Sequence, residues 1–228
     1  MTILAVTGLR REARLLAGPG IDVVVGGGDH RRLEAMLEER AAEASGIASI
    51  GIAGALAPDL RPGQWVVARA VLDRTEALPA DRAWTDRLAA RLPGTVEGTF
   101  LGIDAMVAEE TDKAALHAAT KAIAVDMESH VVARVAARHG RPFAAARVIC
   151  DPAHRTLPPA ARVGMRPDGR MDVRAVLRAL IIEPGQLPDL MRTAWEAERA
   201  FRSLLRGHRI LGAGLAGPDL GQLPLDMV

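Results

Sequence analysis

The sequence predicts an α/β fold built on a largely parallel sheet. Short apolar runs rich in β-branched residues alternate along the chain with longer segments rich in Ala, Leu and Arg, and this alternation is typical of strands joined by helices. Most of the apolar runs end at Gly or Asp, which favour turns. Because parallel neighbouring strands need a crossover that is usually helical, the alternation also indicates parallel pairing.

Each expected element follows from its own run of residues. The apolar runs predict strands at Thr2–Val6, Ile21–Val25, Ile47–Ile52, Trp65–Val71, Val96–Leu101, Ala122–Val125 and Phe143–Ile149. The longer segments predict helices at His30–Ala44, Asp81–Leu92, Asp112–Ala119, Met127–His139 and Leu187–Arg206. The fourth helix has the clearest apolar face, because Met127, Val131 and Val135 recur every four residues. Gly140 and Pro142 end that helix.

The length of 228 residues is enough for one sizeable core and short for two domains. We therefore expect a single domain over residues 1–206. Residues 150–169 contain four prolines and no clear period, so they predict a long loop of the kind that often forms a lid. Residues 207–228 are rich in Gly and Pro and predict a tail that is frayed or packed on a partner.

Composition and charge exclude several classes of protein. Lys and Arg number 29 against 28 for Asp and Glu, and aromatic residues make up 3%, so the chain lacks the basic surface and stacking side chains that nucleic acids require. A single cysteine excludes an internal disulfide framework and a multi-cysteine zinc site. The N-terminus lacks the features of a signal peptide, and no run of about 18 apolar residues occurs. We expect a soluble, cytoplasmic protein.

Two glycine-rich turns follow predicted strands. Gly26–Gly28 precedes a helix as a phosphate-binding loop does, but Arg31 stands where the dinucleotide fingerprint needs a small residue, which favours an ordinary tight turn. Gly51–Gly54 would let a ligand approach the main chain closely. The six histidines show no metal-ligand spacing, so we expect no metal. Cys150 has no basic neighbour in the sequence, which favours a small filler over a nucleophile.

Three carboxylates are more informative. Glu12 follows the first predicted strand, Glu128 lies in the first turn of a helix, and Asp151 follows the last predicted strand. The C-terminal ends of parallel strands meet at the ligand-binding edge of an open sheet, so the three acids are expected to converge. Arg147 lies four residues before Asp151 on the same strand face and is expected to reach toward it. Taken singly, the acids also fit structural roles, in which Asp126 caps a helix, Glu128 favours its dipole and Asp151 begins a turn.

A signature of a known superfamily lies in residues 122–153, AIAVDMESHVVARVAARHGRPFAAARVICDPA. This segment closely resembles the one shared by purine nucleoside phosphorylases and methylthioadenosine/adenosylhomocysteine nucleosidases: an apolar strand, acid-Met-Glu, a helix, Pro-Phe and Arg-x-x-Ser-Asp. The resemblance extends upstream and keeps the superfamily's order of segments, through TGLRREARLL, GIAGALAPDLRPGQWVV and GTFLGIDAMV. The resemblance implies a three-layer αβα phosphorylase/hydrolase-like fold with a central, mostly parallel twisted sheet, and it implies no cofactor.

The resemblance also implies roles for individual residues. Asp151 matches the acid that protonates the purine at N7, Glu12 matches the residue that activates water, and Arg147 matches an arginine that would orient the acid. Glu128 matches the glutamate that binds the ribose hydroxyls, and Met127 would lie under the sugar. The other substrate-binding residues that we expect are Leu9, Ala53, Gly54, Met106 and Val107.

Three positions depart from the superfamily's pattern. Ile52 stands where phosphorylases place a phosphate-contacting hydroxyl, which favours water over phosphate as the acceptor, although Arg10 and Arg11 could still recruit phosphate. Around Met106 the aromatic residue beside the base is replaced, so stacking on the purine is expected to be weaker or supplied elsewhere. Cys150 stands where Ser is usual.

The overall character of the chain, including QLPDLMRTAWEAERAFRSLL, looks most like the hopanoid-associated branch of the superfamily. This likeness implies release of adenine from adenosylhopane, a nucleoside with a large, lipid-like 5′ group, with peripheral contact at the inner face of the membrane. The superfamily's assemblies imply a homodimer. Three alternatives stay open: a methylthioadenosine/adenosylhomocysteine nucleosidase, a phosphate-dependent purine nucleoside phosphorylase, and a binding module that senses a nucleoside without turnover.

Overall fold

The computed structural model describes residues 2–163, 169–170 and 172–218. The strands are β1 (Ile3–Thr7), β2 (Ile21–Val25), β3 (Gly46–Ala55), β4 (Trp65–Asp73), β5 (Glu76–Pro79), β6 (Val96–Gly102), β7 (Ala124–Asp126) and β8 (Phe143–Asp151). The α-helices are α1 (Arg10–Leu16), α2 (His30–Ala41), α3 (Arg82–Arg91), α4 (Glu110–Thr120), α5 (Ser129–Arg138), α6 (Pro159–Arg162), α7 (Val173–Ile182) and α8 (Leu187–Leu211). Two short 3-10 turns are Pro184–Gln186 and Ala213–Ala216.

The described strands form one twisted sheet in the order β2-β1-β3-β7-β6-β4-β5, and β8 pairs with both β3 and β4. Strand β8 pairs with β3 and β4, β6 pairs with β4 and β7, and β7 pairs with β3. These five strands therefore close into a ring. Among the described strands, five pairings are parallel and three are antiparallel, so the mostly parallel sheet expected from the sequence is confirmed.

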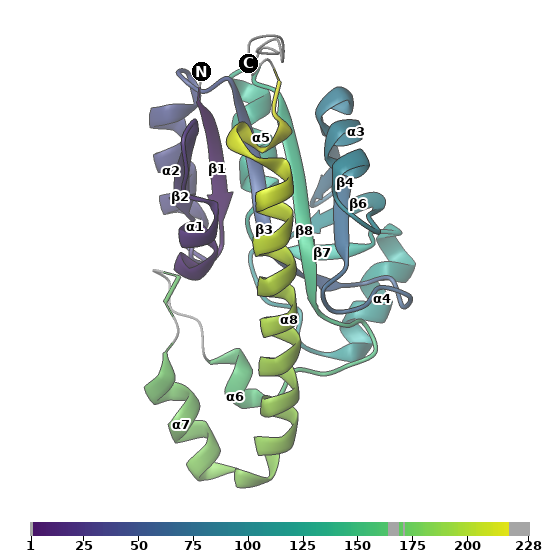
Figure 1. Cartoon of the computed structure of the whole chain (residues 1–228). Coiled ribbons are helices and arrows are strands. Elements are labelled where there is room, and N and C mark those ends of the chain that lie inside the picture. The colour runs from purple at the N-terminus through teal and green to yellow at the C-terminus, as the bar shows by residue number, and fades with distance from the viewer. Residues whose placement is uncertain (1, 164–168, 171, 219–228) are drawn as a thin grey trace.

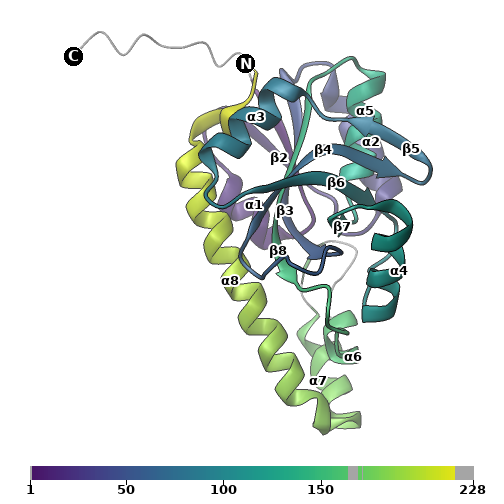
Figure 2. The ribbon, with the colours of Figure 1, turned by 90° about the vertical axis from the view of Figure 1, so that its right-hand side faces the viewer.

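Helices cover both faces of this sheet (Figure 1). On one face α2 and α5 pack over an apolar core that includes Leu33 and Val131. On the other face lie α1, α3 and α8, over a second core that includes Trp65, Trp84 and Leu204. Figure 2, turned by 90°, shows the strands between α8 on one side and α2 and α5 on the other. The expected layers of helices around a central sheet are therefore confirmed.

The long loop expected over residues 150–169 is shorter than predicted. Strand β8 continues to Asp151, and α6 forms within the proline-rich stretch, with Pro159 as its first residue. Proline is favourable at that position, because its missing N–H would have no partner in the first turn. Residues 164–168 of the expected loop lie outside the described residues. Three short elements have no counterpart among the predicted ones: α1, α7 and the edge strand β5, which are 7, 10 and 4 residues long.

Helix α8 ends at Leu211 rather than at Arg206, because Gly207 continues the helix instead of ending it. A Cβ atom at Gly207 would lie 2.2 Å from Cζ2 of Trp65, so the glycine lets α8 pack directly on that buried indole. The Nε1–H of Trp84 then donates a hydrogen bond of 2.9 Å to the carbonyl of Leu215. Residues 207–216 thus pack on the sheet instead of forming the expected tail, and residues 219–228 lie outside the described residues.

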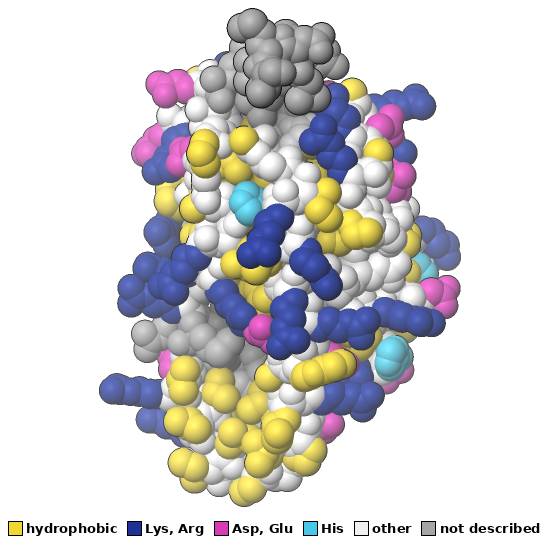
Figure 3. All heavy atoms as spheres, viewed as in Figure 1, with side chains coloured by type: hydrophobic (Ala, Val, Ile, Leu, Met, Phe, Trp, Pro, Cys, Tyr) yellow, Lys and Arg dark blue, Asp and Glu magenta, His cyan; other side chains and the backbone are white. Residues whose placement is uncertain are grey.

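The α7–α8 hairpin, residues 173–195, projects beyond the end of the sheet (Figure 2). Helix α7 has no fully buried residue. The large apolar side chains that the hairpin exposes are Val173, Leu177, Ile181, Ile182, Leu187, Met191 and Trp195. Figure 3 shows them as an apolar patch beneath a band of basic side chains. No helix in the described part of the chain is long and apolar enough to cross a membrane.

Candidate active site

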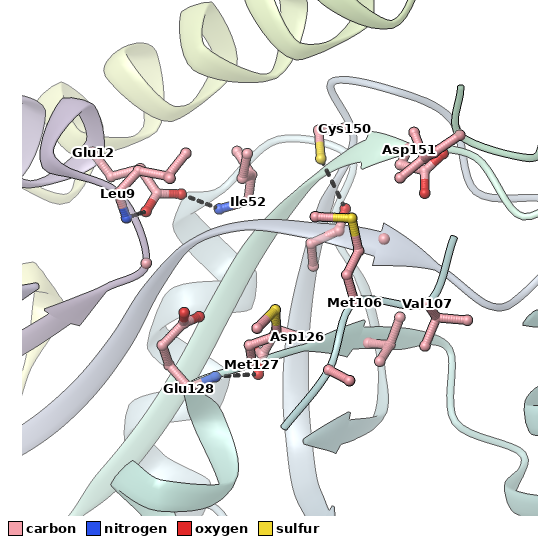
Figure 4. A pocket seen from close by; sticks show the side chains of 16 residues that line it. Leu9, Glu12, Ile52, Met106, Val107, Asp126, Met127, Glu128, Cys150 and Asp151 are labelled. Carbon is pink, nitrogen blue, oxygen red and sulfur yellow. Dashed lines mark hydrogen bonds between the residues drawn. The ribbon is translucent and has the colours of Figure 1, made fainter. Parts of the chain in front are cut away.

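A cavity of about 160 Å³ opens at the C-terminal ends of β1, β3, β7 and β8 (Figure 4). Apolar side chains make up much of its wall, among them Ile52 and Leu157. Nine of the ten site residues expected from the sequence line it: Leu9, Glu12, Ala53, Gly54, Met106, Val107, Met127, Glu128 and Asp151. The expected convergence of the three acids at the sheet edge is therefore observed. Arg147, the tenth residue, lies behind the cavity wall.

Glu12 lies on the first turn of α1, directly after β1, and its side chain is buried. Its Oε2 accepts a hydrogen bond of 2.7 Å from the N–H of Leu9, and its Oε1 accepts one of 2.7 Å from the N–H of Ile52. A Cβ atom at Gly51 would lie only 2.6 Å from Oε1 of Glu12, so the carboxylate needs a glycine there. Burial raises the pKa of Glu12, against the opposing effect of the Arg147 charge and the backbone N–H groups.

Arg147 is fully buried on β8 and binds acids other than the one we expected. Its Nε donates a hydrogen bond of 2.8 Å to Oδ2 of Asp126. Its Nη2 donates to Ser49 Oγ at 2.6 Å and to Glu128 Oε2 at 3.3 Å. The expectation that Arg147 orients Asp151 is therefore wrong about its partner, since the guanidinium lies among Asp126, Glu128 and the charge of Glu12.

A β-bulge at the end of β8 explains this difference. Ala53 of β3 pairs with Ile149, but the next residue, Gly54, pairs with Asp151, so Cys150 is an extra residue in the strand. The extra residue breaks the alternation of side chains on which the expected contact between Arg147 and Asp151 depended. A bulge of this kind leaves no mark in the apolar pattern of the sequence.

Glu128 lies between Arg147 and the cavity, with its side chain almost fully buried. Burial, helped by the neighbouring charges of Asp126 and Glu12 and opposed by Arg147, raises its pKa to about 7. Its backbone is fixed by Asp126, whose Oδ1 accepts hydrogen bonds from the N–H of Glu128 at 3.2 Å and the N–H of Ser129 at 2.9 Å. Asp126 thus caps α5 as the sequence predicted, while its Oδ2 binds Arg147.

Asp151 lies across the cavity from Glu12 (Figure 4). Its Oδ2 accepts a hydrogen bond of 2.5 Å from Nζ of Lys113, a fully buried residue of α4. Burial raises the pKa of Asp151 to about 6, even though Lys113 acts in the opposite direction. Lys113 was not among the site residues predicted from the sequence. A signal was present, because Lys113 is one of only two lysines in a chain that otherwise uses arginine.

Cys150 and a cluster of two histidines with Asp104 carry groups that could react or bind a metal. Burial raises the pKa of the Cys150 thiol, which favours a filler over a nucleophile. His30 and His130 lie at the N-terminal ends of α2 and α5. Oδ1 of Asp104 lies 3.2 Å from Nδ1 of His30 and 3.0 Å from Nε2 of His130. Neither histidine's second ring nitrogen has a partner in the described structure, whereas metal-binding histidines usually donate that N–H to a fixed acceptor. We therefore assign this cluster to hydrogen bonding.

Comparisons with known proteins agree with this architecture. The crystal structure of 5′-methylthioadenosine/S-adenosylhomocysteine nucleosidase from S. pneumoniae with a transition-state inhibitor shares 17% identity, with a TM-score of 0.61, over 93% of this chain and 100% of that chain. The nucleosidase of the same name from Helicobacter pylori shares 18% identity, with a TM-score of 0.64, over 92% of this chain and 96% of that chain. Futalosine hydrolase from Helicobacter pylori shares 20% identity, with a TM-score of 0.57, over 66% of this chain and 88% of that chain. No curated protein sequence matches this one.

A family model described as the phosphorylase superfamily matches residues 21–182, well over half of the chain. The match includes β2 to β8 and the segments that carry Glu128 and Asp151. The class of enzyme expected from the sequence, one that cleaves the N-glycosidic bond of a nucleoside, is confirmed at this level. The chain belongs to the phosphorylase superfamily.

Proposed function

We propose that the protein hydrolyses the N-glycosidic bond of adenosylhopane, an adenine nucleoside with a large apolar 5′ group, and releases adenine. Cleavage needs a proton for the departing base, a partner for the sugar hydroxyls, and a nucleophile at the anomeric carbon. Asp151 would donate the proton, Glu128 would bind the ribose, and Glu12 would activate water.

One observation carries this proposal: Glu12 and Asp151 lie on opposite sides of one cavity, and Glu128 lines it on the same side as Glu12 (Figure 4). The raised pKa of Asp151, about 6, suits a group that must carry a proton near neutral pH. The wall beside them is apolar, which suits the face of a purine and a sugar. A sensing module would need the same contacts to the sugar but would not need two acids at opposite ends of the bond.

Water is favoured as the acceptor by the main chain around Ile52. The N–H of Ile52 donates to Glu12, and its side chain brings no hydroxyl to the cavity that could bind a phosphate oxygen. Glu12 itself would repel an incoming phosphate dianion while attracting the proton of a water molecule. These features favour a hydrolase over a phosphorylase.

The large apolar 5′ group is supported by what lies next to the cavity. A cavity of about 160 Å³ is smaller than the roughly 300–1,000 Å³ of most ligand pockets, so a large 5′ group must extend beyond it. Leu157 lies in the cavity wall, and two residues later the chain enters α6, which packs against α7. The chain thus leads from the cavity wall through α6 to the exposed hairpin, whose apolar patch would meet the membrane face.

The substrate is tested by following free adenine from adenosylhopane, methylthioadenosine and adenosine, each with and without phosphate. We expect the highest kcat/KM with adenosylhopane and no effect of phosphate. Faster cleavage of methylthioadenosine would replace the lipid assignment with a general nucleosidase, and products that contain ribose 1-phosphate would identify a phosphorylase. Tight binding of the nucleosides without release of adenine would identify a sensing module.

The membrane contact is tested separately with vesicles of anionic phospholipid. We expect the wild type to sediment with them and Ile181→Asp to stay in solution, because Ile181 is 80% exposed in the apolar patch. Ile210→Asp is the matched control, since Ile210 is an exposed isoleucine near the far end of α8. Equal sedimentation of both variants would contradict this role of the hairpin. The expected homodimer is checked by light scattering, where a mass near 24.2 kDa would count against it.

A further inference from the structure

Lys113 has an unusual position for a lysine. It is the only buried residue of α4, all of which the structure describes. Its ammonium group lies 2.5 Å from Oδ2 of Asp151, 2.8 Å from the carbonyl of Arg155 and 3.2 Å from the carbonyl of Pro152. An ammonium group has three N–H donors, so each of its protons has an acceptor. A buried cation that is fully satisfied in this way is fixed in place, because any movement would leave a charge without partners.

This arrangement distinguishes the two oxygens of Asp151. Oδ2 is bound to Lys113, whereas Oδ1 is buried without a hydrogen-bond partner in the described structure. Asp151 lines the cavity, and Figure 4 shows its carboxylate at the wall that faces Glu12. A buried oxygen without a partner is costly, and it becomes favourable when a ligand supplies the missing hydrogen bond.

We propose that Lys113 is a positioning residue for Asp151: it holds Oδ2, so that Oδ1 is the oxygen that carries the proton to N7 of the leaving base. The proposal rests on the proposed function, since it assigns Asp151 the role of the acid. In the step itself, the proton on Oδ1 passes to N7, and the bond between the base and the sugar breaks with its electron pair going to the base. Asp151 becomes a carboxylate, and the water that Glu12 activates forms the new bond at the cationic anomeric carbon. Lys113 stays protonated and stabilises that carboxylate.

Lys113 also affects the pH at which the acid works. Burial raises the pKa of Asp151, and the charge and hydrogen bond of Lys113 lower it. The other charged groups near Asp151 are Glu196 of α8, which raises the pKa, and Arg155 of the following loop, which lowers it. Arg155 and Glu196 form an ion pair with each other, so their effects on Asp151 oppose one another. Lys113 is therefore the group whose removal should change the proton affinity of Asp151 most.

The test compares the pH profiles of kcat/KM for adenine release in the wild type, Lys113→Met and Lys113→Arg. Asp151 must be protonated to act, so activity falls as pH rises through its pKa. Removing the positive charge raises that pKa, and we expect the alkaline limb of Lys113→Met to move up by about one pH unit or more. We also expect its maximal kcat to fall by about 10- to 100-fold, because the acid is no longer held in place. In Lys113→Arg the limb should stay in place while kcat falls, since a planar guanidinium keeps the charge but not the geometry.

Lys121→Met is the matched control, because Lys121 is the other lysine of the chain and lies exposed at the end of the same helix. Its pH profile should equal that of the wild type. If Lys113→Met does not fold, Lys113→Gln takes its place as a neutral variant that still donates hydrogen bonds. An active wild type with an unshifted limb in the neutral variant would overturn the role of Lys113 alone. A wild type that releases no adenine would instead overturn the proposed function on which this role depends.

Discussion

The main-chain N–H of Ile52 donates a hydrogen bond of 2.7 Å to Oε1 of Glu12, so strand β3 holds a carboxylate that belongs to helix α1. The second oxygen of Glu12 accepts from the N–H of Leu9, and both oxygens are therefore acceptors. A glutamine at this position has only one acceptor oxygen, and its NH₂ group would face an N–H donor. Replacing one carboxylate oxygen of Glu12 by an NH₂ group therefore breaks one of these two backbone hydrogen bonds.

We expect Glu12→Gln to be nearly inactive, because the variant loses the carboxylate that we propose to activate water and also one of the two backbone hydrogen bonds. The measurement is adenine release at saturating substrate, with circular dichroism to verify the fold. Added phosphate should not restore the activity of the variant. Restoration by phosphate would show that water activation is not the task of Glu12.

Asp151→Asn should reduce base release by about 10²- to 10⁴-fold while the fold stays intact. The amide oxygen of asparagine can replace Oδ2 as the acceptor for Lys113, but the side chain has no proton to give to a base. Single-turnover adenine release and the thermal unfolding midpoint are measured together. Near-normal release would remove Asp151 from the mechanism.

Gly51→Ala should impair the site although no catalytic group is changed. The new Cβ atom would lie 2.6 Å from both Oε1 of Glu12 and Nη1 of Arg147, so these two buried groups must move. Gly185→Ala is the matched control, because a Cβ atom there meets nothing within 4 Å. We expect a loss of kcat only in Gly51→Ala, and similar activity in the two variants would show that the packing around Glu12 tolerates a methyl group.

Glu128 should make the folded protein less stable at higher pH. Its pKa is about 7 in the folded state against an ordinary value of 4.5, so the folded state binds more protons than the unfolded state in that window. Stability therefore falls as pH rises from about 4.5 to about 7, and the loss persists above it. Urea unfolding at pH 5 and pH 8 should show a smaller loss of stability in Glu128→Gln than in the wild type. An equal loss in both proteins would contradict the raised pKa.

The elements that the sequence predicted well are those with a local pattern. Seven of the eight strands described, all except β5, are apolar runs, and α5 repeats its apolar face around Val131 and Val135, so each could be placed from its own residues. The positions of Glu12 and Asp151 followed from the rule that parallel strands end at one edge, since β1 and β8 both run parallel to β3, whereas Glu128 follows β7, which is antiparallel to β3. That rule needs only the order of the elements, which the sequence contains.

The errors arose where the outcome depends on contacts between distant residues. Gly207 continues a helix because Trp65 lies beneath it, and nothing near Gly207 in the sequence indicates that partner. The partner of Arg147 depends on the extra residue Cys150 in β8, which shifts the register of the strand end. Lys113 is 38 residues from Asp151 along the chain, so only the folded structure brings the two together.

The order of the elements after β8 bears on how new specificities could evolve in this fold. The chain leaves the sheet after Asp151 and forms α6 and α7, between which the carbonyl of Gly169 accepts a hydrogen bond of 3.1 Å from the N–H of Arg10. It reaches the core again with Phe201 and Leu204 of α8. The carbonyls of Pro152 and Arg155 hold Lys113, and Leu157 lines the cavity, so this first stretch is tied to the site. Helix α7 has no buried residue, so it can be exchanged without altering the closed ring of strands that fixes the acids. In the proposed function, cleavage of the bond and choice of the 5′ group therefore depend on separate parts of the chain, and a graft of residues 173–182 from a relative is the way to transfer a substrate preference.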